Sequence, residues 1–108
     1  MANYLFIESR DPFESHEVRD SYELAQGLVD QGDKVTVFLV QNAVLPVRKN
    51  KFSHLIEDMA KKGVQVMADD FALQMRGITN DKMIPEVAIG KLDTVVDSLA
   101  AGHKVIWN

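Results

Sequence analysis

Five short apolar runs are spaced along the chain and separated by longer mixed segments. An apolar run without alternating polar positions is typical of a strand that is covered on both faces. The second run is the clearest strand, because β-branched, aromatic and aliphatic side chains fill it. The five runs lie at residues 4–7, 35–40, 64–68, 86–89 and 104–107.

Three of the segments between these runs repeat apolar residues three or four positions apart, which predicts amphipathic helices. The first helix can begin with Asp11 as N-cap and Pro12 in its first turn, or with Ser15 as N-cap, and we favour Ser15. A shorter helix is predicted at residues 71–75, and residues 41–50 are predicted to form a loop. The three apolar stripes are Val18, Tyr22, Ala25 and Val29; Phe52, Leu55, Ile56, Met59 and Ala60; and Leu92, Val95, Val96, Leu99 and Ala100.

The alternation of strands and helices predicts a single α/β domain over residues 1–108 with a mainly parallel sheet. If the second, third and fourth strands are added in one direction, right-handed crossovers place their three helices on one face of the sheet. The last helix would then cover the other face alone. Because a five-stranded sheet needs more than one helix on each face, we expect a homo-oligomer to cover the remainder.

The amino-acid composition limits the kinds of partner that we expect the protein to bind. Of the 108 residues, 46% are hydrophobic and 26% are charged, as in ordinary globular domains. The net charge of -4 argues against a nucleic-acid partner, and the short basic cluster at residues 48–51 is predicted to be a solvated loop. The first residues contain no basic leader and no apolar run is long enough to cross a membrane, so we expect a cytoplasmic protein without a membrane partner.

The chain contains no cysteine, which excludes disulfides, thiolate metal sites and cysteine nucleophiles. It also lacks a Walker loop and the G-x-G-x-x-G pattern of dinucleotide-binding folds. His16 lies near the carboxyl edge of the predicted sheet, His54 on the polar side of a helix and His103 at the opposite, amino-terminal edge, so no pair has metal-ligand spacing. We therefore expect no cofactor and identify neither a catalytic residue nor a set of metal ligands.

Parallel strands end at one edge of the sheet, and the residues just past these ends are the candidates for a binding site. Carboxylates at this edge could hold a cation such as Mg²⁺ or take part in acid–base chemistry. The alternative is structural: Asp70 caps the next helix, while Asp69 and Glu8 face solvent. The candidates at the strand ends are Glu8, Ser9, Arg10, Gln41, Asn42, Asp69, Asp70 and Gly90.

Residues 37–45, 63–67, 72–78 and 86–92 follow one another in an order and spacing that resembles the DsrE/DsrF-like family. That family includes sulfur-relay subunits of sulfur oxidation and of tRNA thiolation. The resemblance extends over nearly the whole chain. It implies a three-layer α/β/α sandwich, a parallel sheet of five strands in the order 4-3-2-1-5, and assembly into a trimer or hexamer.

Active members of the family carry a cysteine just past the third strand, which holds sulfur as a persulfide on a mobile loop. The matching position here, counted back from Arg76 and Gly77, is Asp69, and Ala72 falls where some members have a second cysteine. The resemblance implies that the side chain at this position is accessible and near the amino terminus of the following helix. A carboxylate cannot carry sulfane sulfur, so persulfide transfer is not expected.

The resemblance therefore implies a non-catalytic binding or accessory subunit associated with sulfur metabolism, with a cysteine-bearing relative as a further candidate partner. The alternative is a small enzyme or ligand-binding protein that uses Glu8, Asp69 and Asp70 with a cation or water. The residues that we carry forward as ligand-binding candidates are Glu8, Ser9, Asn42, Asp69, Asp70 and Arg76.

Overall fold

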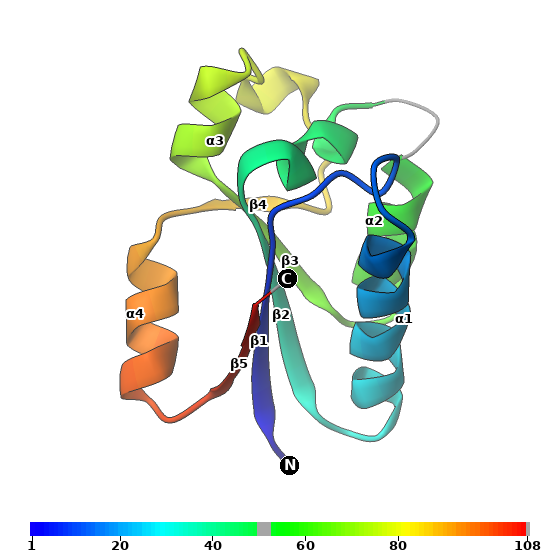
Figure 1. Ribbon diagram of the computed structural model, residues 1–108, viewed down its shortest axis with the longest axis vertical. Helices are drawn as coiled ribbons and strands as arrows, with labels where there is room; N and C mark the ends of the chain where they lie inside the picture. Colours follow the sequence, from blue (N-terminus) through cyan, green and yellow to red (C-terminus); the bar gives the residue numbers. More distant parts are fainter. Residues whose placement is uncertain (50–52, 108) are drawn as a thin grey trace.

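The structure, a computed structural model, describes residues 1–49 and 53–107. Its five strands form one sheet in the order β4-β3-β2-β1-β5, which confirms the expected order (Figure 1). Each neighbouring pair of strands is parallel. The strands are β1 (Asn3–Glu8), β2 (Lys34–Leu39), β3 (Gln65–Asp69), β4 (Ala88–Gly90) and β5 (Lys104–Trp107).

Helices lie on both faces of the sheet, which gives the expected three-layer α/β/α sandwich (Figure 1). The helices α1 (His16–Asp30) and α2 (Ser53–Lys61) contact each other on one face, and α4 (Asp93–Ala100) lies on the other. The short α3 (Asp70–Met75) lies beyond the carboxyl ends of the strands, where it contacts β3. A helix of 6 residues is too short to run back along the sheet, so the expectation that three helices cover one face is wrong for α3. No helix in the described ranges has the length and apolarity needed to cross a membrane.

Local signals placed most strand ends to within one residue. The Ser15 hydroxyl accepts a hydrogen bond of 3.2 Å from the backbone N–H of Glu17, which confirms Ser15 as the N-cap of α1. The strand β4 begins and ends later than predicted, at Ala88 and Gly90. The prediction that Phe52 belongs to the stripe of α2 falls outside the described residues.

The predicted loop after β2 is instead the 3₁₀-helix η1 (Gln41–Val47). Its buried residues Ala43, Val44 and Val47 pack into the core, which holds the segment in place. Such short 3₁₀ pieces have no apolar repeat that distinguishes them from a loop, and this explains the error. A second 3₁₀ turn, η2 (Asn80–Lys82), lies in another segment that was predicted to be irregular.

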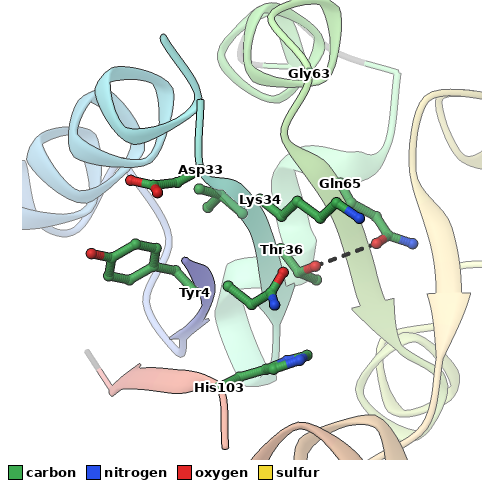
Figure 2. A pocket seen from close by; sticks show the side chains of 9 residues that line it. Tyr4, Asp33, Lys34, Thr36, Gly63, Gln65 and His103 are labelled. Atoms are coloured by element: carbon green, nitrogen blue, oxygen red, sulfur yellow. Dashed lines mark hydrogen bonds between the residues drawn. The ribbon is translucent and has the colours of Figure 1, made fainter. Parts of the chain in front are cut away.

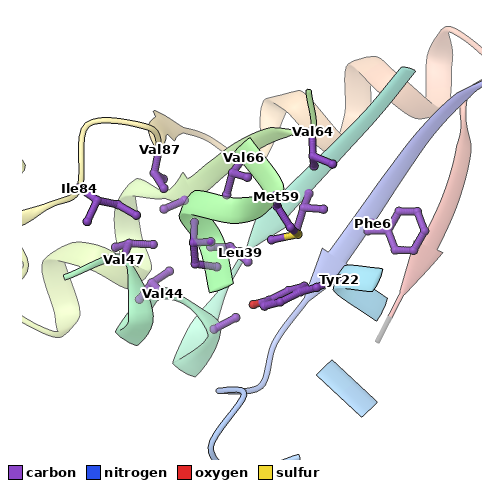
Figure 3. Close-up of a cluster of buried hydrophobic side chains, with 14 of the residues drawn as sticks. Phe6, Tyr22, Leu39, Val44, Val47, Met59, Val64, Val66, Ile84 and Val87 are labelled. Atoms are coloured by element: carbon purple, nitrogen blue, oxygen red, sulfur yellow. The ribbon is translucent and has the colours of Figure 1, made fainter. Parts of the chain in front are cut away.

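The main core lies between the sheet and the pair formed by α1 and α2 (Figure 3). Alternate strand residues such as Phe6 and Val66 pack there against Tyr22 and Met59. The residues between them point to the opposite face and form a smaller cluster under α4. That cluster contains Leu5, Ile7, Phe38 and Val40, with Met67, Val95 and Val105 partly buried against it.

The helix α4 has no buried residue, in contrast to α1 and α2. Val95 packs on the sheet, whereas Leu92, Val96 and Leu99 are 58%, 63% and 59% exposed. The prediction that Val96 lies at the centre of a buried stripe is therefore wrong for the single chain. The apolar spacing of α4 identified a helix but did not specify what covers its outer side.

Candidate functional site

The strand β3 passes into α3 without a connecting loop, because Asp69 ends the strand and Asp70 begins the helix. The Asp69 Oδ2 atom accepts a hydrogen bond of 3.0 Å from the backbone N–H of Ala72, so Asp69 is the N-cap. Asp69 is only 7% exposed. Its expected place at the amino terminus of the helix is confirmed, but the expectation of an accessible side chain is wrong.

Asp70 occupies the first turn of α3 and is half-buried. A carboxylate there is favourable because the amino end of a helix carries partial positive charge. The structural alternative, in which Asp70 caps the helix and Asp69 faces solvent, is therefore wrong, because Asp69 is the N-cap. The reason is that β3 runs one residue further than the apolar alternation indicated.

Two candidates from different elements, Asn42 and Arg76, are in direct contact. The Asn42 Oδ1 atom accepts hydrogen bonds from Arg76 Nη2 at 2.9 Å and from Arg76 Nε at 3.3 Å. Arg76 Nη1 also donates to the carbonyl of Ala72 at 3.2 Å, and Asn42 Nδ2 donates to Glu14 Oε1 at 3.3 Å. This network ties η1 and α3 to the segment that precedes α1.

The residue before Asn42 has an unusual backbone conformation. Gln41 has a φ of 50°, in the left-handed region that residues with a side chain rarely adopt. Such conformations persist only where the surrounding structure holds them. Here the conformation directs the chain from β2 into η1 and brings Asn42 within reach of Arg76.

Glu8, at the carboxyl end of β1, is 1% exposed, so the alternative in which it faces water is wrong. The alternation of β1 points Glu8 to the same face as Phe6, toward α1 and Tyr22. Burial, together with the nearby carboxylates of Glu8 and Asp11, raises the pKa of the Tyr22 hydroxyl above its usual value. That hydroxyl is buried and has no hydrogen-bond partner among the described residues.

The remaining candidates at the strand ends are spread over the rim. Ser9 is half-buried, whereas Arg10 is exposed and pairs with Glu17 at 2.6 Å. Gly90 packs closely, because a Cβ atom there would lie 2.6 Å from Met67 Cε and 3.0 Å from Phe38 Cε2. Tyr22 and Glu14 were not among the predicted site residues, since the first belongs to a helix stripe and the second to a predicted loop.

The carboxylates that the cation hypothesis requires are not gathered into one cluster. Glu8 lies on β1 and Asp69 on β3, and β2 separates the two strands. Within residues 1–49 and 53–107, no group of three or more histidine or acidic side chains could hold a metal ion. The rim instead divides into a capped strand–helix junction, an Asn42–Arg76 contact and a buried Glu8–Tyr22 region.

Known proteins resemble this chain in sequence family and in fold. The model of the DsrE/DsrF-like family matches residues 2–107. The ychN protein from E. coli superposes with a TM-score of 0.89 at 23% identity, with 100% of both chains covered. The protein of unknown function MTH1491 from Methanobacterium thermoautotrophicum gives 0.86 at 16% identity, again over 100% of both chains.

A third solved structure, the conserved protein of unknown function BT1422 from Bacteroides thetaiotaomicron, gives a TM-score of 0.79 at 14% identity. It covers 97% of this chain and 94% of its own. The search of curated proteins finds no match. At these identities the solved structures establish the shared fold alone.

Proposed function

The chain belongs to the DsrE/DsrF-like family, and we propose that it is a non-catalytic binding or accessory subunit associated with sulfur metabolism. The observation that carries this proposal is the structural use of Asp69, the residue at the position of the family's cysteine. Its carboxylate is 7% exposed and is held by the backbone N–H of Ala72. Because the chain has no cysteine, persulfide transfer is not expected of it.

The proposal includes assembly into a homo-oligomer, a trimer or a hexamer, in the cytoplasm. It is supported by the outer side of α4, where Leu92, Val96 and Leu99 are more than half exposed, and by Trp107 on β5, which is 68% exposed. Removing one such apolar side chain fully from water lowers the free energy by about 1.5–3 kcal/mol. Several of them on the face that α4 covers alone favour a protein partner there.

Light scattering with paired variants tests the assembly. The wild type should be oligomeric at micromolar concentration, and Val96→Asp should dissociate it by placing a charge in the interface. Leu24→Asp is the matched control, because Leu24 is 52% exposed on α1, on the opposite side of the sheet. A monomeric wild type, or equal dissociation by both variants, would contradict the proposed interface.

A reconstitution experiment tests the accessory role. The chain is mixed with a cysteine-bearing DsrE/DsrF-like protein that has been loaded with sulfur from polysulfide. We expect a stable complex in which the partner carries added sulfur mass and this chain carries none. A melting temperature that rises with Mg²⁺ in the wild type but not in Asp69→Asn would instead support the alternative, a cation-dependent ligand-binding protein.

A further inference from the structure

A hollow lies at the amino-terminal end of the sheet, at the edge opposite the candidate site (Figure 2). Its volume is about 540 Å³, within the usual range for small-molecule sites. The starts of β1, β2 and β3 line it together with His103, the residue that precedes β5. Four neighbouring strands of one sheet therefore fix the positions of its side chains.

The register of the strands gathers polar side chains on one face of this edge. Lys34 and Thr36 alternate with Val35, so both point toward the α4 face, as Phe38 does further along β2. Gln65 is the registered neighbour of Thr36, and it also points to that face. On the other side of β2, Asn3 is the registered neighbour of Lys34.

The register of β1 with β5 also places His103 at this edge of the sheet. Tyr4 is registered with Lys104, so Asn3 lies beside His103 one step earlier along the two strands. Further along the strands, the α4 face is apolar and buried, as shown by Leu5 and Phe38. The hollow thus begins where the apolar cluster ends.

Several hydrogen-bond donors border this hollow. The Thr36 hydroxyl donates to Gln65 Oε1 at 3.3 Å, which turns the carbonyl of the Gln65 amide toward Thr36 and leaves its N–H₂ group to donate elsewhere. Figure 2 shows the Lys34 side chain extending toward Gln65, with His103 across the hollow from them. An ammonium group, a carboxamide N–H₂ and an imidazole ring therefore border one space.

Acidic side chains are scarce in the same place. Asp33 is the one acidic residue among those that line the hollow. Its Oδ1 atom accepts a hydrogen bond of 2.9 Å from the backbone N–H of Ala2, and Figure 2 shows it directed away from Thr36 and Gln65. Lys34 is therefore the charged group on the Thr36 and Gln65 side of the hollow, and its ammonium group attracts anions there.

We propose that this hollow binds a small molecule through an oxyanion group, with Lys34, Gln65 and His103 as the residues that hold it. Lysine is a common ligand of phosphate-type groups, and amide N–H donors add direction to the contact. The shared chemistry is a group with two or more anionic oxygens, as in phosphate, sulfate or carboxylate. The inference does not depend on the proposed function at the other edge.

Nuclear magnetic resonance titration of the ¹⁵N-labelled chain tests the site, with inorganic phosphate, sulfate and acetate added separately at constant ionic strength. We expect at least one anion to cause saturable shifts of the Gln65 side-chain N–H₂ signals and of the His103 backbone amide. The anion with the tightest binding identifies the oxyanion class. The absence of saturable shifts at millimolar concentrations of all three anions would overturn the proposal.

Three variants make the test specific. Lys34→Gln should weaken binding about tenfold, because a hydrogen bond to a charged group is lost. Gln65→Glu should abolish binding, since it replaces a donor by a carboxylate of the same shape. Lys91→Gln removes the same charge from an exposed position outside the hollow, and it should bind as the wild type does. Equal binding by the wild type and by Lys34→Gln would refute the assignment.

Discussion

Replacement of Tyr22 by phenylalanine should change how stability depends on alkaline pH. The Tyr22 side chain is 3% exposed, and burial beside Glu8 and Asp11 raises the pKa of its hydroxyl. Below pH of about 10, the usual pKa of tyrosine, the hydroxyl is protonated in both the folded and the unfolded chain, so it adds no pH dependence. Above that pH the unfolded chain loses the proton while the folded chain keeps it.

The free energy of unfolding should therefore fall by about 1.4 kcal/mol per pH unit above the unfolded pKa of Tyr22. Tyr22→Phe removes this contribution and should show a correspondingly shallower decline. Near neutral pH the variant should be as stable as the wild type or more stable by about 1 kcal/mol, because a buried hydroxyl without a partner among the described residues is removed.

Urea unfolding at a series of pH values, followed by far-ultraviolet circular dichroism, measures both effects. The single tryptophan, Trp107, is 68% exposed and is a poor probe of the core. Lysines also titrate in this range, so the informative quantity is the difference between variants. Tyr4→Phe is the control and should keep the wild-type slope, since it retains Tyr22. If Tyr22→Phe also keeps that slope, Tyr22 ionises normally and its placement beside the two carboxylates is wrong.

Three further predictions concern Asp69, the reactivity of the strand–helix junction, and the two apolar helix faces. Asp69→Ala should lower the free energy of unfolding by about 1 kcal/mol in urea titrations and Asp69→Asn by much less, because asparagine also caps helices; equal losses would contradict the cap. The thiol of Asp69→Cys should react with iodoacetamide far more slowly than that of Asp70→Cys, as judged by intact mass, because Asp69 is 7% exposed and Asp70 is half-buried; equal rates would show that position 69 is open. Ile56→Ala should lower the free energy of unfolding by about 2–5 kcal/mol, because Ile56 is fully buried. Val96→Ala should lower it by less than about 1 kcal/mol in the dilute monomer, and a larger loss would mean that Val96 packs within its own chain.

The features that the sequence predicted well are those decided by neighbouring residues. The apolar runs located all five strands, and Ser15 marked the start of α1 because an N-cap needs only its own hydroxyl and the next turn. The strand order came from the family resemblance, since the repeated strand–helix pattern is compatible with several orders.

The features that were missed depend on contacts between distant segments. Whether Asp69 or Asp70 caps α3 depends on where pairing with β4 ends, and Asp69 pairs with Gly90. The burial of Glu8 depends on α1 lying over the end of β1. The exposure of Val96 depends on whether a partner covers α4, which no pattern within one chain can specify.

The direct passage from β3 to α3 limits how far the side chain of Asp69 can move. Active relatives are expected to carry their sulfur on a mobile loop, which lets one cysteine visit a donor and then an acceptor. Here Asp69 belongs at once to a strand ladder and to a helix cap, so its position is tied to two elements. Replacing Asp69 by cysteine would supply the sulfur atom, but the cysteine would not be free to move between two partners. A sulfur-carrying role at position 69 would therefore need a longer connection between β3 and α3.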